Sequence, residues 1–445
     1  MLNNVLKYFN LLSQYPRNSG NEAQVANFLV EFAKQHNLEF YKDEHNNVLI
    51  KKQGIKEPII LQSHTDMVCV SEPDYKIDFL TQPIKTVIEG DYLSAYKTSL
   101  GADNGIGVAI ILSLLEEDND YSIEALFTTD EEVTMTGALN FDYSKLSSKK
   151  LISLDGMSDE ELINGCASIC DMKIKFTPNF NQCNYLGYKV IVKGLKGGHS
   201  GADINKDLGN ANNVLVEILS SLSDIQLASF EGGNQFNFIA DYAFASFASK
   251  DFSEKFDLIK KQMQNKYPSL DLQYEEVTLN KVLSSQDSAK LLCLLNKIKT
   301  GVIAGTNDKI VLSQNLANVS LSKGLIKISQ RGHNEKFEDE NIQKLKSLSQ
   351  KNGFEFEIFD KQCGFESLEN SILTKDICDS YKKLFNKNLM VINKHISVEA
   401  CIFKQKVPDM DIAIIAPKIL GAHSTKERVY IPSIDNIYKL LKTIL

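Results

Sequence analysis

Residues 59–68, Ile-Ile-Leu-Gln-Ser-His-Thr-Asp-Met-Val, constrain the fold more than any other stretch of the chain. They begin as an apolar run typical of a buried β-strand and stop at His64 and Asp66. Successive side chains of a strand point to opposite faces, so the two-residue spacing directs this histidine and this carboxylate the same way. Such a pair at the end of a strand suits a metal site, with the carboxylate orienting the histidine ring. Alone it is more often a surface turn, so other segments must supply further ligands.

Other acidic or histidine residues follow similar segments. The strand-like residues 123–128 lead into Asp130, Glu131 and Glu132, and residues 151–154 lead into Asp155. The glycine-rich turn 98–107 carries Asp103 before an apolar, helix-permissive stretch, and the strand-like residues 411–416 precede His423. Strands that alternate with helices predict an α/β fold with a doubly wound, mostly parallel sheet, whose ligands gather outside the carboxyl ends of the strands.

The pattern changes near residue 186. Segments 188–195, 238–248, 272–279 and 316–329 are typical of strands, the last as a hairpin around Lys323-Gly324, and helices are expected between them. Because these segments lack clustered ligands, they predict a separate α/β lid domain inserted into the first. We expect a catalytic domain in residues 1–186, the inserted domain in 187–365, and the second part of the catalytic domain, including a helix at 372–385, in 366–445.

The segment around residue 20 carries a helix-start signal. Ser19 and Glu22 have the spacing of a capping box, in which Ser19 is the N-cap and Glu22 reaches back to it. Apolar residues then recur at helical spacing from Val25 to Ala33. We therefore expect a helix that starts at Ser19 and packs one face on a core.

Charge and cysteine usage narrow the classes of function. The chain has 57 acidic and 49 basic residues, a net charge of −8, and no Lys/Arg cluster interleaved with aromatic residues. This argues against nucleic acid or an anionic membrane as a partner. No run of eighteen apolar residues and no signal-peptide pattern is found, so we expect neither a membrane span nor export. Eight scattered cysteines without a CxxC pair indicate reduced thiols and a cytoplasmic protein.

Each candidate residue has an ordinary structural explanation, such as a helix cap, a turn or a solvated loop. Together, however, two imidazoles and three carboxylates can supply two divalent ions that share one bridging carboxylate. That donor mix suits zinc, manganese or cobalt. One of Glu131 and Glu132 would then remain available as a base.

Six motifs resemble those of the aminoacyl-histidine dipeptidases, also called peptidase D or Xaa-His dipeptidases, a branch of the M20 dinuclear metallopeptidases. The similarity runs from Pro16 to the C-terminus. The motifs are His64-Thr-Asp66-Met-Val, Leu100-Gly-Ala-Asp-Asn-Gly-Ile-Gly107, Thr129-Asp-Glu-Glu132, Leu154-Asp-Gly156, Gly197-Gly-His-Ser-Gly201 and Gly421-Ala-His-Ser424.

The resemblance implies a role for each matching residue. It implies two divalent ions, zinc before manganese or cobalt, and a water activated between them. The metal ligands it implies are His64 and Asp155 on one ion, Glu132 and His423 on the other, and Asp103 as the bridge. It further implies that Asp66 orients His64 and that Glu131 is the general base.

In the inserted domain, the resemblance implies that His199 stabilises the oxyanion, often across a subunit interface, and that the lid forms a homodimer. Asn237 and Arg331 match substrate-binding positions, and an arginine suits bidentate capture of a peptide carboxylate. Without the resemblance, His199 would be explained as part of a flexible glycine turn and Arg331 as a solvated strand end.

The resemblance predicts hydrolysis of small peptides, Xaa-His and related dipeptides. The alternatives are an M20 tripeptidase, an N-acyl amino acid deacylase, or a non-catalytic peptide-binding protein. Some motifs depart from the branch: Thr425 replaces a proline, residues 165–169 replace a Gly-Cys-Ala-Gly-Gly run, residues 395–399 replace His-Ala-Gly-Leu-Glu, and residues 238–241 lack a proline. These departures affect the expected specificity and leave every ligand and the base in place.

Overall fold

The computed structural model describes residues 2–366, 368 and 370–445, which form two compact units. Unit 1 comprises Met1–Gly165, Phe365–Asn393 and Val398–Leu445, and unit 2 comprises Cys166–Gly364 and Lys394–Ser397. Unit 2 begins earlier than the predicted residue 187 because β9 (Ser168–Lys175) already pairs with two strands of the unit 2 sheet. The catalytic and lid roles assigned to these parts stay predictions.

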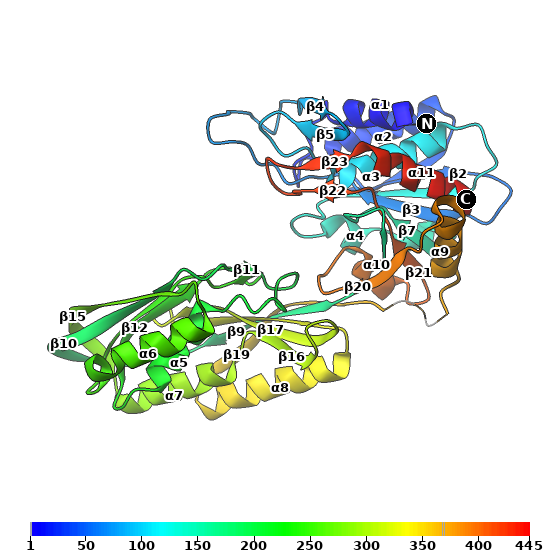
Figure 1. Cartoon of the computed structure of the whole chain (residues 1–445). Coiled ribbons are helices and arrows are strands. Elements are labelled where there is room, and N and C mark those ends of the chain that lie inside the picture. The colour runs from blue at the N-terminus through cyan, green and yellow to red at the C-terminus, as the bar shows by residue number, and fades with distance from the viewer. Residues whose placement is uncertain (1, 367, 369) are drawn as a thin grey trace. The chain divides into compact units, whose positions relative to one another are not determined.

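Unit 1 is built on an eight-stranded sheet (Figure 1). Its four central strands run parallel, and antiparallel strands flank them on both sides. This confirms the predicted α/β class with a mostly parallel sheet. The order is β1 (Glu39–Lys42), β2 (Val48–Lys52), β6 (Ile123–Thr128), β3 (Ile59–His64), β7 (Lys150–Ser153), β21 (Asp411–Ile414), β8 (Glu161–Cys166) and β20 (Met390–Lys394).

The central strands are covered on both faces, as expected of a parallel sheet. Every residue of β3 and of β6 is buried. The helices of unit 1 that contribute to its core are α1 (Leu2–Leu12), α2 (Ala23–Gln35), α3 (Ala102–Glu116), α9 (Ile372–Phe385) and α11 (Ile431–Ile444). Residues 102–115 of α3 are all buried, because this helix is apolar on every side.

Shorter elements complete unit 1 around this core. They are α4 (Thr136–Asn140), the 3₁₀ turn Tyr143–Lys145, α10 (Ala400–Lys406), and a four-stranded antiparallel sheet of β22 (Ile419–Leu420), β23 (Arg428–Tyr430), β5 (Tyr92–Ala95) and β4 (Thr86–Glu89). The turn between β22 and β23 contains His423, so this small sheet fixes where that histidine lies.

The predicted capping box at the start of α2 is wrong. The helix begins at Ala23, its N-cap is Glu22, and no side chain caps it. The Ser19 hydroxyl instead donates to Asp66 Oδ2 at 2.7 Å. Glu22 Oε1 accepts from the amides of Gly20 at 3.0 Å and Asp130 at 3.1 Å. Contacts with distant loops therefore replaced the local cap that the spacing predicted.

Unit 2 is a nine-stranded antiparallel sheet with helices (Figure 1). The hairpin of β17 and β18 confirms the turn predicted around Lys323-Gly324. The strands in order are β15 (Asp271–Leu283), β10 (Phe180–Lys193), β14 (Ala243–Ala248), β12 (Gln226–Gly233), β17 (Ile310–Ser320), β18 (Leu325–Gly332), β9 and β19 (Glu355–Gln362), and β16 (Gly301–Gly305) pairs with β17. The helices are α5 (Ala211–Ser220), α6 (Phe252–Lys266), α7 (Ser285–Lys297) and α8 (Glu335–Lys351).

The segment predicted as one strand over 238–248 is divided in two. Its start forms β13 (Phe238–Ile239), which pairs with β11 (Gly198–His199) in a separate two-stranded sheet. Its end forms β14 in the large sheet. This division places His199 on a short ribbon next to the strand-like residues that follow Asn237.

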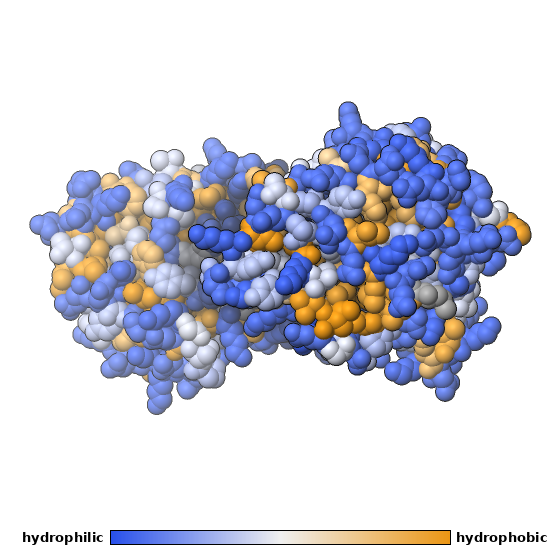
Figure 2. Space-filling model, turned by 90° about the horizontal axis from the view of Figure 1, so that it is seen from above, coloured by the Kyte–Doolittle hydropathy of each residue, from blue (hydrophilic) through white to orange (hydrophobic). Residues whose placement is uncertain are grey.

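The molecular face in Figure 2 is mostly hydrophilic, with separate hydrophobic patches. Within the described part of the chain, no helix has the length and apolar character needed to cross a membrane.

Candidate metal centre

The predicted metal ligands of unit 1 lie together at one edge of its sheet. His64 ends β3, Glu131 and Glu132 follow β6, and Asp155 follows β7. These three strands are parallel neighbours in the order β6, β3, β7, so their carboxyl ends meet at the same edge. Asp103 joins them from the first turn of α3, and His423 joins them from the turn after β22.

The two imidazoles face different oxygens of one carboxylate. Asp103 Oδ1 lies 3.4 Å from His64 Nε2, and Asp103 Oδ2 lies 3.1 Å from His423 Nε2. His64 Nε2 also lies 3.7 Å from Asp155 Oδ1 and 4.0 Å from Glu131 Oε2, whereas His423 Nε2 lies 2.9 Å from Glu132 Oε1. Asp103 thus occupies the middle position between two groups of donor atoms.

Donor atoms of these groups are close enough to hold a common ion. In each of two sets of three, one donor atom per residue lies within 4.8 Å of the others: His64, Glu131 and Asp155 form one set, and His64, Asp103 and Glu132 form the second. His64 and Asp155 share a set, as the predicted ligation requires. Glu131 shares it with them, so the predicted base borders the predicted ligands directly.

Asp66 fixes both the ring of His64 and the loop after β6. Its Oδ1 lies 3.2 Å from His64 Nδ1, and its two oxygens accept from the backbone amides of Glu131 and Glu132 at 3.1 Å each. Burial raises the pKa of Asp66, but the hydrogen bonds from His64, Ser19 and the Glu132 amide lower it below its usual value. Asp66 is therefore an ionised acceptor that leaves His64 Nε2 directed at the cluster.

The cluster buries more negative than positive charge. Burial, with the nearby charge of Asp155, raises the pKa of Glu131 well above its usual value. Burial likewise raises the pKa of Glu132 and of Asp155. Hydrogen bonds to Asp103 and Glu132 raise the pKa of His423 to about 10. The carboxylates thus recruit protons when no other cation is near, and divalent cations would supply the missing positive charge.

The donor chemistry of the cluster fits such ions. Glu132 Oε1 is buried and lies 2.9 Å from His423 Nε2, so the carboxylate and the imidazole present donor atoms to the same place. Neutral imidazoles with carboxylates are common ligands of zinc, manganese and cobalt. Residues His64, Asp103, Glu132, Asp155 and His423 could hold a pair of them.

The remaining predicted residues, His199, Asn237 and Arg331, belong to unit 2. His199 Nδ1 accepts from the amides of Gly201 at 3.1 Å and Ala202 at 3.0 Å. An accepting Nδ1 places the ring proton on Nε2, which leaves an N–H donor. Burial and the charge of Arg331 lower the pKa of His199, so the ring is neutral near pH 7.

Arg331 and Asn237 differ in what they offer a substrate. Arg331, at the end of β18, is only 5% exposed, and its Nε donates to no described partner. It is not the solvated strand end that was its ordinary alternative. Asn237 is exposed, and its carbonyl accepts from the Ser200 amide at 2.8 Å.

Sequence reasoning missed several charged residues that are buried around the cluster. Glu399 is 1% exposed, and its Oε2 accepts from Gln62 Nε2 at 2.6 Å and Thr128 Oγ1 at 2.7 Å. Burial raises the pKa of Glu399 to about 8. The sequence did offer one signal for Glu399: it is a single acidic residue between Val398 and the apolar start of α10. A charged side chain buried at such a position needs a polar partner. Arg17 and Glu427 were missed in the same way.

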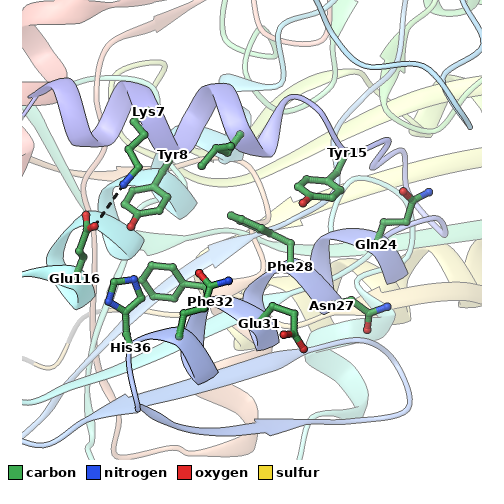
Figure 3. Close-up of a pocket in the computed structure, with 12 residues that line it drawn as sticks. Lys7, Tyr8, Tyr15, Gln24, Asn27, Phe28, Glu31, Phe32, His36 and Glu116 are labelled. Atoms are coloured by element: carbon green, nitrogen blue, oxygen red, sulfur yellow. Dashed lines mark hydrogen bonds and ion pairs between the residues drawn. The ribbon is translucent and has the colours of Figure 1, made fainter.

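A cavity of about 690 Å³ lies elsewhere in unit 1, between α1 and α2 (Figure 3). Aromatic rings of Tyr15 and Phe28 face it, and the Lys7–Glu116 ion pair, 3.4 Å long, closes one end. It shares no residue with the metal centre. This cavity and the candidate metal centre are therefore separate features of unit 1.

Comparison with known proteins gives matches over nearly the whole chain. Residues 60–445 match the family model described as peptidase family M20/M25/M40. The cytosol non-specific dipeptidase of Escherichia coli strain K12 is 32% identical over 477 aligned positions, which cover 98% of this chain and 96% of that protein.

Solved structures agree with these sequence matches. The aminoacylhistidine dipeptidase from Vibrio alginolyticus superposes with a TM-score of 0.88 at 27% identity, covering 98% of this chain and 96% of that one. A tripeptidase from Staphylococcus aureus superposes with a TM-score of 0.59 at 16% identity, covering 100% and 97%, which shows a shared fold alone.

Proposed function

We propose that this chain, which belongs to peptidase family M20/M25/M40, hydrolyses dipeptides with the help of two divalent cations. One observation carries the proposal: the imidazoles of His64 and His423 face opposite oxygens of Asp103 at the carboxyl edge of the parallel sheet. A relative at 32% identity over nearly the full length is named a dipeptidase, which supports this substrate class.

Five residues would hold the two cations. His64 and Asp155 would bind one, Glu132 and His423 the other, and Asp103 would bridge them. The distances of 3.4 and 3.1 Å from Asp103 to the two imidazoles support the bridging role. Zinc is the ion we propose first, with manganese and cobalt as alternatives of similar ligand preference. Bound divalent cations polarise the peptide carbonyl and lower the pKa of a coordinated water.

Glu131 would act as the general base. Its carboxylate lies 4.0 Å from His64 Nε2, at the border of the ligand set, and its raised pKa suits a group that accepts and then holds a proton. In this scheme Glu131 takes the proton of the attacking water and delivers it to the leaving amine. Asp66 keeps His64 oriented and, through two amide hydrogen bonds, holds the loop that carries Glu131.

Unit 2 would supply groups that act on the substrate. The neutral ring of His199 has its Nε2–H free to donate to the oxyanion that forms on the peptide carbonyl. Arg331, buried and with an unused Nε–H, would bind the substrate carboxylate, and Asn237 would add a polar contact. Formation of a homodimer through unit 2 remains a prediction from the resemblance, and analytical ultracentrifugation measures it directly.

The substrates we propose are Xaa-His and related dipeptides. The solved relative at 27% identity is named an aminoacylhistidine dipeptidase, while the curated relative is named non-specific, so we expect several dipeptides to be cleaved. The name of the curated relative also supports our proposal of a cytosolic location.

A substrate panel tests this function. Purified protein is loaded with Zn²⁺ or Mn²⁺ and incubated with Xaa-His dipeptides, other dipeptides, tripeptides and N-acetyl amino acids, with a chelator-treated sample as control. We expect release of amino acids from dipeptides alone. Faster cleavage of tripeptides would instead indicate a tripeptidase, and faster cleavage of N-acetyl amino acids would indicate a deacylase. Full metal loading without any hydrolysis would favour a non-catalytic peptide-binding protein.

A further inference from the structure

We propose that Arg17 and Glu427, two buried charged residues outside the ligand set, are positioning residues that hold the metal ligands in place. They would fix the turn that carries Asp103 against the segments that carry His64 and His423. The inference rests on the proposed metal-dependent function and deepens it. It is carried by hydrogen bonds, burial and the glycine pattern around Asp103.

Arg17 links two ligand-bearing segments through their carbonyl groups. Arg17 is only 2% exposed. Nη1 donates to the carbonyls of Thr65 and Asp66, each at 3.1 Å, directly after His64, and Nη2 donates to the carbonyl of Gly101 at 2.5 Å, two residues before Asp103. One planar group therefore sets the spacing between the end of β3 and the start of α3.

Glu427 holds the same turn through its amide groups. Its Oε2 accepts from the amides of Leu100 at 2.7 Å and Gly101 at 2.9 Å, and its Oε1 accepts from the amide of Asp103 at 3.2 Å. Glu427 is 3% exposed and lies in the same β22–β23 turn as His423. Its hydrogen bonds therefore tie the segment of one proposed ligand to the segment of another.

The glycines of the Asp103 motif leave room for Arg17. Gly101 has φ +69°, and a Cβ on it would lie 2.3 Å from Arg17 Nη2. A Cβ on Gly105 would lie 2.6 Å from the same nitrogen. Any larger side chain at either position would displace the guanidinium. The spacing of these two glycines thus reflects the approach of Arg17 as well as the turn itself.

The charge of Arg17 also complements the cluster. Burial lowers the pKa of Arg17, whereas the charges of Glu427, Asp66 and Asp103 raise it, so the guanidinium is an additional buried cation near acidic ligands. Lysine at this position would keep the charge but lacks the fork that reaches three carbonyls. Residues that orient metal ligands typically change metal affinity or activity about 10- to 100-fold when replaced.

The test compares Arg17→Lys and Glu427→Gln with wild type, and Arg428→Met is the matched control. Arg428 follows Glu427 directly, but it is exposed and lies over the ring of Tyr92, 4.7 Å from its centroid. Metal-free protein is titrated with Zn²⁺ by calorimetry and with Co²⁺ by visible absorption. Unfolding temperatures are recorded for the metal-free and the metal-loaded forms.

We expect both test variants to bind Zn²⁺ about 10- to 100-fold more weakly and to show altered Co²⁺ absorption bands. Their metal-induced gain in unfolding temperature should shrink, and excess metal should restore most of kcat without changing KM. Arg428→Met should behave as wild type. Wild-type metal affinity and Co²⁺ bands, with unfolding temperatures lowered equally in both forms, would overturn the proposal and leave a purely structural role.

Two features keep this test decisive. If Arg17→Lys does not fold, Glu427→Gln alone decides, because it removes one acceptor oxygen and keeps the side-chain volume. The metal titration uses no peptide, so it holds even for a protein that cleaves none of the panel substrates. A failure of the proposed function and a failure of this inference are therefore told apart.

Discussion

Unit 1 and unit 2 bury polar side chains of different kinds. Unit 1 buries charged groups, among them Arg17, His64, Asp66, Asp103 and Glu427. Among the described residues of unit 2, the buried polar side chains are amides and hydroxyls except for Arg331 and Glu338. The difference follows the sheets: parallel strands bring their carboxyl ends to one edge, whereas antiparallel strands distribute theirs between two.

The buried side-chain amides of unit 2 hold backbone segments in place and form no charged cluster. Asn315 Nδ2 donates to the carbonyls of Phe236 and Phe238 at 3.2 and 2.8 Å, on either side of Asn237. Asn210 and Asn212 each donate to the carbonyl of Leu316 at 3.1 Å. We infer that unit 1 is arranged to hold cations and unit 2 to present donors in a fixed geometry. The following predictions test this contrast.

Replacement of the base in unit 1 should have the largest effect. Glu131→Gln removes the proposed proton acceptor but no ligand, so kcat should fall by about 10²- to 10⁴-fold while two metal ions per chain remain. Steady-state kinetics and metal analysis measure both quantities. The exposed Glu340→Gln in unit 2 is the control for loss of one carboxylate. A Glu131→Gln enzyme with the wild-type rate would remove Glu131 from the mechanism.

Replacement of the donor in unit 2 should affect catalysis and not the metals. His199→Ala removes the proposed oxyanion donor, and kcat should fall by about 10²- to 10³-fold. Zinc affinity, measured by calorimetry on the same preparation, should equal that of wild type because the proposed ligands lie in unit 1. A parallel loss of zinc affinity would contradict the division of roles between the units.

Replacement of Asp66, the proposed orienting carboxylate of unit 1, should weaken the metal centre itself. Asp66→Ala removes the partner of His64 Nδ1 and the acceptor for the amides of Glu131 and Glu132. Metal affinity or activity should decrease by about 10- to 100-fold. Titration of the metal-free protein measures this, and an unchanged variant would make Asp66 an ordinary turn residue.

The last prediction concerns the pH dependence of stability in unit 2. Burial raises the pKa of Asp171 from its usual value of 3.8 to about 6, so the folded chain favours the protonated form. Stability is therefore lost as pH rises from about 4 to about 6, by about 3 kcal/mol at most, at 1.4 kcal/mol per pKa unit.

Asp171→Asn keeps this position uncharged at every pH. The unfolding temperature of the variant minus that of wild type should increase between pH 4 and pH 6. Above pH 7 this difference should stay constant. Thermal unfolding monitored across that range measures the difference. A difference between the two proteins that is constant with pH would show that Asp171 titrates normally.

Some features were predictable because they depend on neighbours along the chain. The alternation of strands with helices predicted the parallel sheet of unit 1, and Lys323-Gly324 predicted the β17–β18 hairpin. The acidic and histidine residues at strand ends predicted which side chains meet, since parallel strands share one edge. The helix expected at 372–385 is α9 as observed.

Other features were not predictable because they depend on residues far away in the sequence. Ser19 and Glu22 have the spacing of a cap, yet they bind Asp66 and Asp130. The start of unit 2 depends on the pairing of β9 with β18 and β19, which no local pattern shows. A local signal is overridden wherever a distant partner offers a buried hydrogen bond, because an unpaired buried polar group is costly.

The sequence by itself determined which ligands we propose, since residue type and position after strand-like or glycine-rich segments single out two histidines and three carboxylates, with Glu131 beside them as the proposed base. Only the tertiary structure decided how these ligands are held. The guanidinium of Arg17 and the carboxylate of Glu427 satisfy backbone groups of the Asp103 turn from positions at opposite ends of the chain. Every residue except proline carries the same backbone carbonyl and amide groups, so the partners of these groups become visible only when the chain is folded.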